Sequence, residues 1–228
     1  MGFDSSSTCW TMIQGAASGD QSQRARFAQR YGPVVDAYLS ARWRLSPLRA
    51  DLGDASQDVM LECLKDGGAL ERADPGRRAG FRGFLRGVVR NVAARCEERV
   101  RRRGSQPLHS SDAEHLPGLQ EEDLDRVFDR AWAGSIMEQA ADRLDELARD
   151  GSPAFRRRAE LLRLRFRDGV PLRDVAVRWD LQPARIHKDY ARAREEFREA
   201  LREVIAWHLP DAADGIDEEC RNLLALLQ

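Results

Sequence analysis

Apolar residues recur at helical spacing along most of this 228-residue chain, and this periodicity constrains the fold more than any other feature. The clearest example lies between residues 80 and 103, where one face of a predicted helix carries Phe81, Leu85, Val88, Val89, Val92, Cys96 and Val100. No run of residues alternates apolar and polar side chains as a half-buried strand would. The sequence therefore predicts an all-α protein.

The same periodicity and the turn residues delimit the other helices. Helices are predicted over residues 21–43, 52–64, 124–148 and 172–179, from Pro183 onward, and after Asp217. Proline opens a helix readily because the first helical position has no intrahelical hydrogen bond to lose. The stretch ADPGRRAG, residues 73–80, is predicted to be a loop because proline and glycine interrupt helices. Near the N-terminus, Trp10 and Ile13 are expected to pack against the first domain.

Charge is distributed in blocks that the near-neutral total conceals. The formal net charge of the chain is −1, yet residues 77–103 carry +8 and residues 151–208 carry +5. Residues 104–150, between them, carry −8, and residues 209–228 carry −4. Two basic blocks are typical of a protein that binds a polyanion, because cations that neutralise phosphates release condensed counterions. The alternative is that each block is an ordinary solvated helix face.

Several classes of function find no support in the sequence. The four cysteines are far apart and form no C-x-x-C pair, so we expect reduced core thiols rather than a zinc site or a disulfide framework. The histidines lack metal-ligand spacing, and neither a glycine-rich phosphate loop nor a nucleophile elbow is present. We therefore expect no cofactor and no enzyme activity. Because apolar runs are short and the N-terminus lacks signal-peptide order, we expect a cytoplasmic location.

Residues 171–201 carry the strongest local pattern, two helices separated by a three-residue break at 180–182. This arrangement is typical of a helix-turn-helix, whose second helix enters the DNA major groove. The candidate DNA contacts are Ala184, Lys188 and Arg192 on the face opposite its apolar stripe, with Arg185 and His187 at the margins of that face. Alanine permits close approach, while the long basic side chains reach phosphates or guanine edges. Two ordinary packed helices would show the same stripe.

Three motifs follow one another along the chain. They are LRADLGDASQDVMLECL, then FRGFLRGVVRNVAARCEERVRRR, and then PLRDVAVRWDLQPARIHKDYARAR. In this order they resemble motifs of bacterial sigma factors of the sigma-70 family, extracytoplasmic-function type. The first resembles that family's acidic D-x-x-D-x-x-Q-[DE]-V segment. The second resembles F-x-x-W-L-x-x-I-A-x-N before an arginine-rich helix, with Phe84 where tryptophan is usual, and the third resembles its helix-turn-helix.

The resemblance implies a domain organisation. Residues 21–103 are expected to form a region 2-like bundle of three or four helices, and residues 151–206 a region 4-like helix-turn-helix domain. An acidic, partly helical linker, residues 104–150, would join these two small domains. Residues 1–20 form an N-terminal extension outside the resemblance. Residues 207–228 form an acidic, amphipathic extension, expected either to cap a domain or to mask a basic surface.

The resemblance also assigns roles to residues. In the first domain, the acidic segment would bind the β′ clamp helices of core RNA polymerase through Asp51, Asp54, Gln57 and Asp58. The minus-10 promoter element would be bound by Arg77, Arg78, Phe81, Arg82, Arg90, Asn91 and Arg101. The helix-turn-helix candidates would bind the minus-35 element, and their domain would contact the β flap.

Each assignment in the first domain has an alternative. The acids are also common at helix N-termini, where the macrodipole stabilises them. Phe81 or Phe84 could be a core residue, and Asn91 could bond the backbone. Gly53 stands where the family often has another acid, and a phosphate on Ser56 is one way of replacing that charge.

The function implied is that of a bacterial, nucleoid-associated sigma factor, which gives core RNA polymerase promoter specificity. An anti-sigma factor or a Ser/Thr kinase would be a further partner. Two alternatives stay open. A one-component helix-turn-helix regulator would bind DNA without being a polymerase subunit, and a helical interaction protein would need neither basic block.

Overall fold

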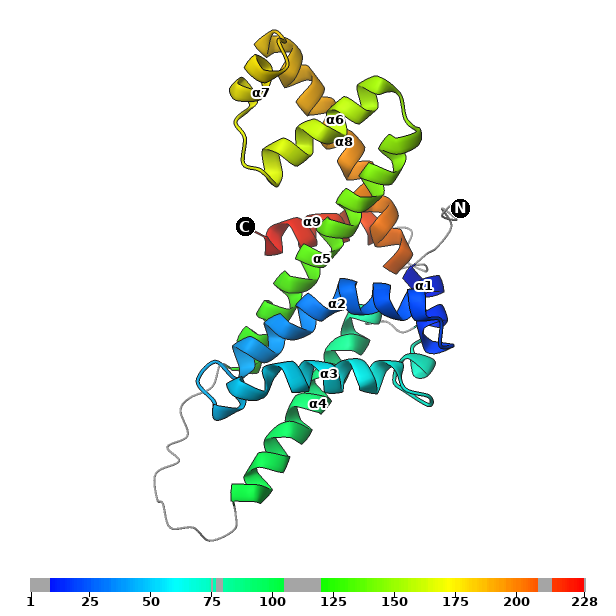
Figure 1. The fold of residues 1–228 in the computed structure, drawn as a ribbon, viewed down its shortest axis with the longest axis vertical. Helices are drawn as coiled ribbons and strands as arrows, with labels where there is room; N and C mark the ends of the chain where they lie inside the picture. The colour runs from blue at the N-terminus through cyan, green and yellow to red at the C-terminus, as the bar shows by residue number, and fades with distance from the viewer. Residues whose placement is uncertain (1–8, 75, 77–79, 105–119, 209–214, 228) are drawn as a thin grey trace. The chain divides into compact units, whose positions relative to one another are not determined.

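The computed structural model describes residues 9–74, 76, 80–104, 120–208 and 215–227, and all regular structure within them is helical. The helices are α1 (Cys9–Ala17), α2 (Gln21–Arg42), α3 (Leu52–Leu64), α4 (Gly80–Gly104), α5 (Glu121–Asp150), α6 (Pro153–Phe166), α7 (Leu172–Arg178), α8 (Pro183–His208) and α9 (Ile216–Leu226) (Figure 1). Short 3-10 turns occupy Pro47–Asp51 and Leu70–Arg72. The predicted all-α class is confirmed. Within the described ranges, no helix is both long and apolar enough to cross a bilayer.

Local signals fix several helix ends. Asp20 caps α2, because its carboxylate accepts hydrogen bonds from the amides of Ser22 and Gln23 at 2.8 and 3.1 Å. Ser152 caps α6 in the same way, and Pro153 follows it at the first helical position. α3 begins and ends where the sequence predicts, whereas α1 is a helix that the periodicity did not identify.

The chain divides into two compact units. The first unit comprises Met1–Ser135 with Trp207–Gln228, and the second comprises Ile136–Ala206. Both boundaries fall inside long helices, α5 and α8, rather than at the ends of the predicted linker. The first half of α5, expected to be linker, therefore belongs to the first unit.

The first unit is organised around an aromatic core. α2 and α3 lie side by side and α4 crosses them (Figure 1). Tyr31 stacks on Trp132 of α5 at 5.5 Å between ring centroids, and lies 5.2 Å from Phe81 of α4. Trp10 and Ile13 of α1 are buried, which confirms the expected packing of the N-terminal residues. The sequence placed Val100 on the apolar face of α4, but this residue is 42% exposed. None of residues 97–103 of α4 is buried.

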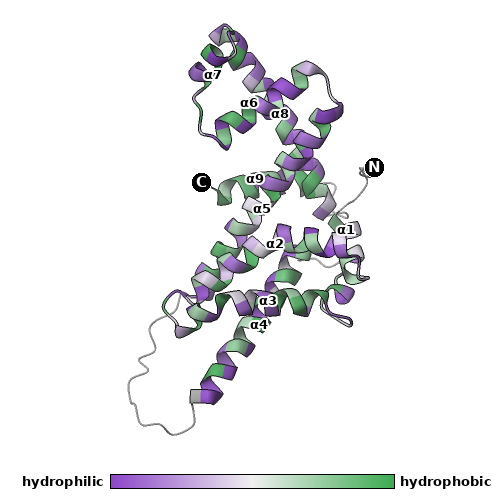
Figure 2. Cartoon of the chain, viewed as in Figure 1, coloured by the Kyte–Doolittle hydropathy of each residue, from purple (hydrophilic) through white to green (hydrophobic). Residues whose placement is uncertain are grey.

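The second unit has two neighbouring hydrophobic clusters. Leu162 of α6 packs with residues of α5 and α8, and Leu161 packs with Val175 of α7 and Ile186 of α8. Successive leucines of α6 thus serve both clusters. Figure 2 shows hydrophilic and hydrophobic residues interspersed along α6 and α8, as expected for helices with one buried face.

Candidate nucleic-acid interface

The turn between α7 and α8 has the backbone of a helix C-cap. Asp180 adopts a left-handed conformation with a φ of 50°, which aspartate tolerates better than most residues. The amide of Leu181 donates to the carbonyl oxygen of Ala176 at 2.9 Å, and the amide of Asp180 donates to that of Val177 at 3.2 Å. These bonds end α7 and redirect the chain before Pro183 opens α8. The predicted two-helix arrangement is confirmed.

The face of α8 opposite its buried stripe is open to solvent. Ile186 and Ala193 are buried, while Tyr190 and Phe197 are half-buried. The five predicted minus-35 residues are all exposed, and they occupy the N-terminal part of the helix: Ala184, Arg185, His187, Lys188 and Arg192. The structure therefore gathers this candidate set on one accessible helix face.

Acidic side chains of α8 are held by arginines of α6. Arg157 pairs with Asp189 at 3.0 Å, and Arg158 forms a bidentate pair with Glu196. Hydrogen bonding to Glu196 raises the pKa of the Arg158 guanidinium above its ordinary value. Because Arg157 neutralises Asp189, this carboxylate does not cancel the positive charge at the N-terminal end of α8. Glu196 also lies 3.6 Å from Arg192 and offsets part of the charge of that arginine.

In the first unit, α4 presents three arginines at four-residue intervals. Arg82, Arg86 and Arg90 therefore lie on one face of the helix. Each is paired with a carboxylate of α5, in reverse order along that helix, which is the pattern of an antiparallel helix pair. The distances are 2.6 Å for Arg82–Asp129, 3.4 Å for Arg86–Asp125 and 3.3 Å for Arg90–Glu121. We call these six residues the arginine ladder.

A second network joins the C-terminal end of α2 to α4 and α5. Arg42 binds Glu97 with two hydrogen bonds of 2.7 and 3.0 Å and reaches Glu121 at 2.9 Å. The indole N–H of Trp43 also donates to Glu97 at 2.8 Å. Burial raises the pKa of Glu97, but the hydrogen bonds from Arg42 and Trp43 outweigh burial and hold that pKa below its ordinary value. The network fixes α4 and the start of α5 against α2.

The predicted minus-10 residues differ in burial and in their partners. The prediction that Phe81 contacts DNA is wrong for this structure. Phe81 is only 1% exposed in the aromatic core, so a DNA base cannot stack on its ring. Arg82 and Arg90 are in the ladder. Asn91 is exposed, and Arg101 is exposed and pairs with Glu98. Arg77 and Arg78 lie outside the described residues.

Sequence reasoning missed Arg86. It belongs to the same stripe as two predicted DNA contacts, and the four-residue spacing was the signal that could have identified it. The acidic partners could not be identified in this way, because they lie more than 30 residues further along the chain.

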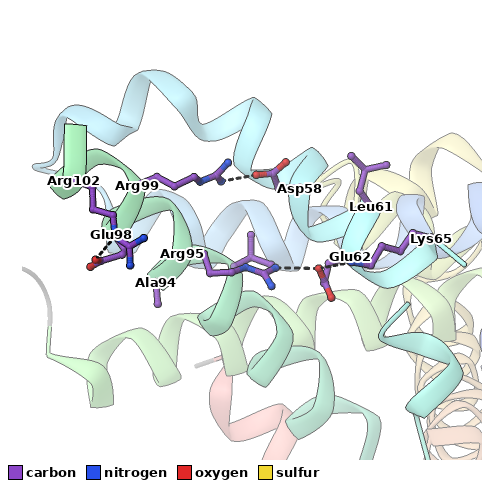
Figure 3. A pocket seen from close by; sticks show the side chains of 10 residues that line it. Asp58, Leu61, Glu62, Lys65, Ala94, Arg95, Glu98, Arg99 and Arg102 are labelled. Atoms are coloured by element: carbon purple, nitrogen blue, oxygen red, sulfur yellow. Dashed lines mark hydrogen bonds and ion pairs between the residues drawn. The ribbon is translucent and has the colours of Figure 1, made fainter. Parts of the chain in front are cut away.

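The predicted polymerase-binding residues lie on or beside α3. Asp51, Asp54 and Gln57 are exposed, whereas Asp58 is half-buried and pairs with Arg99 of α4 at 2.7 Å. Figure 3 shows this pair beside a second one, Glu62 with Arg95 at 3.1 Å. The two pairs line a groove of about 650 Å³ between α3 and α4.

Comparison with known proteins leaves the family open. No protein-family model matches the chain, and no curated protein or solved structure matches it either. What the chain does is therefore inferred from its residues and their geometry.

Proposed function

We propose that this protein is a sigma factor, which binds core RNA polymerase and directs it to promoters. The exposed basic face at the start of α8, in a helix-turn-helix, is the observation that supports this function most directly. In this proposal the second unit binds the minus-35 element and the first unit binds the minus-10 element and polymerase.

The local chemistry of α8 suits a major groove. Ala184 carries only a methyl group, so the helix backbone can come close to base edges. Arg185 and Lys188, on the same exposed face, are long enough to reach phosphates or guanine edges. Asp189, which would repel phosphates, is held by Arg157.

The exposed carboxylates of α3 support the polymerase contact. Asp51 and Asp54 are close in sequence and exposed at the start of the helix, where a basic partner can reach them. Complementary charges of this kind steer association and fix its orientation. A DNA-binding regulator that acts without polymerase gives these acids no role.

Run-off transcription tests the function. Core polymerase is incubated with fragmented genomic DNA, with and without the protein, and the transcripts are mapped. We expect discrete new start sites that share upstream motifs. The variant Arg185→Ala with Lys188→Ala should abolish them, while Arg198→Ala, an exposed arginine further along α8, should leave them unchanged.

Two results would contradict the proposal. One is the absence of new transcripts together with failure of the folded protein to retain core polymerase in a pull-down. The other is tight binding of a dimer to palindromic DNA without polymerase, which would identify a one-component regulator.

A further inference from the structure

The arginine ladder places the basic face of α4 opposite an acidic face of the same chain. We infer that the acidic face of α5 occupies the nucleic-acid-binding arginines of α4 as an intramolecular competitor, which nucleic acid must displace. This inference rests on the proposed function, because it takes α4 to be a nucleic-acid-binding helix.

The contacts resemble those that a phosphate would make. Arg82 grips Asp129 with two N–H groups, Nε to Oδ1 at 2.9 Å and Nη2 to Oδ2 at 2.6 Å. This fork is also the geometry with which arginine binds a phosphate. Four-residue steps place successive carboxylates about 6 Å apart along α5, so the competitor presents a row of anionic groups.

Charge balance makes the competition effective. The three arginines face Asp129, Asp125 and Glu121, and Arg82 also lies 3.5 Å from Glu219 of α9. The positive charge of these three arginines thus faces acidic groups inside the folded unit, and Glu121 is shared between Arg90 and Arg42. A phosphate approaching α4 gains little until a carboxylate gives up its arginine. The acidic C-terminal extension contributes one carboxylate to this arrangement, and α5 contributes three.

Apolar contacts anchor the competitor in addition to the ion pair between Glu121 and Arg42. Leu124, Phe128 and Trp132 form a buried stripe on α5 that runs beside the acidic one. Neutralising the acids should therefore leave α5 docked in the core. The exchange takes place at the arginine side chains, which are already 29 to 47% exposed.

The ion pair between Arg86 and Asp125 is the weakest of the three in the ladder. Arg86 reaches Asp125 at 3.4 Å, and the other carboxylate oxygen, Oδ1, is buried without a hydrogen-bond partner. Asp129, by contrast, is held by two N–H groups of Arg82. Glu121 is held by Arg42 as well as by Arg90. Arg86 is therefore the arginine that we expect to change partner first.

The test uses the full chain with Arg185→Ala and Lys188→Ala, so that the helix-turn-helix contributes little to binding. In this background Glu121→Gln, Asp125→Asn and Asp129→Asn neutralise the acidic face. The control is Glu122→Gln, Glu138→Gln and Asp145→Asn, which changes the net charge equally at exposed positions of the same helix. The probe is a fluorescein-labelled DNA duplex of random sequence with an unpaired bubble, titrated at several salt concentrations.

We expect the ladder variant to bind at least about tenfold more tightly than its parent, with the salt slope steeper by about 2 to 3, since each released arginine adds a phosphate contact. The control should gain much less. Adding Arg82→Gln, Arg86→Gln and Arg90→Gln to the ladder variant should remove the gain.

Equal and measurable affinities for parent and ladder variant would overturn the inference and leave the proposed function standing. An equal gain in the control would also overturn it, since net charge would then be the cause. If neither folded protein binds DNA at low salt, both the inference and the minus-10 role of the first unit fail. If the triple variant does not fold, the single variant Asp125→Asn is used in its place. An affinity for the DNA duplex equal to that of the parent would then overturn the inference.

Discussion

Arg158 of α6 and Glu196 of α8 form a bidentate ion pair in the second unit, with the guanidinium Nε 3.0 and 2.9 Å from the two carboxylate oxygens. The Glu196 residue is only 6% exposed, and the Arg158 side chain 16%. A pair this enclosed is costly to break from one side, because the remaining charge stays buried without its partner. The pair therefore couples the position of α8 to α6.

Glu196→Ala should destabilise the protein by about 3 kcal/mol, because it leaves the Arg158 guanidinium without its buried partner. Urea unfolding monitored by circular dichroism measures the change. Glu195→Ala is the matched control, since Glu195 pairs with Arg198 on the exposed side of the same helix and should cost less than about 1 kcal/mol. If both variants lost the same free energy of unfolding, the enclosed pair would contribute no more to stability than the exposed one.

Phe81→Ala should act on folding before it acts on DNA. The Phe81 ring lies 5.9 Å from Trp10 and 5.2 Å from Tyr31, so its removal leaves a cavity in the aromatic core. We expect a loss of about 3 to 5 kcal/mol of unfolding free energy, and a much smaller loss for Phe81→Leu. A stable Phe81→Ala protein with weakened DNA binding would restore the role predicted from the sequence.

Sequence and structure agree where the signals are local. Pro183 marks the start of α8 through its own backbone chemistry, and the 3.6-residue period identifies the helical ranges of α2 and α8. The ladder could not be predicted, because which acid meets which arginine depends on how α5 packs against α4. Phe81 illustrates the same limit: periodicity puts it on an apolar face, but only the neighbouring helices decide whether that face is covered.

Gly53 offers a direct test of the acidic surface. It is exposed in the first turn of α3, and a Cβ placed there would meet no atom within 4 Å. Gly53→Asp should raise the affinity for core polymerase several-fold, since it adds a carboxylate beside Asp54. Gly53→Ala controls for helix propensity, which alone contributes about 0.5 to 1 kcal/mol to stability. Surface plasmon resonance with immobilised polymerase would separate the two, and equal affinities would argue against binding through this surface.

The cysteines should resist modification in the native protein. All four are buried, and burial raises the pKa of both the Cys9 and the Cys63 thiol to about 12. Because the thiolate is the reactive form, we expect Ellman's reagent to react with these two thiols slowly at pH 8 and promptly in denaturant. Rapid reaction of Cys9 in the folded protein would show that α1 opens readily.

His208 should make the first unit sensitive to acid. Its ring is buried, 5.3 Å from that of Trp132, and burial together with the charge of Arg30 lowers its pKa from 6.5 to about 3. Below pH 6.5 the unfolded chain takes up a proton that the folded chain refuses, so stability is lost as the pH falls from 6.5 toward 3. Between pH 7 and pH 5 this histidine should account for a loss of about 2 kcal/mol. Comparing urea unfolding of the protein and of His208→Phe at both pH values isolates that share, and an identical pH dependence in the two would contradict the assignment.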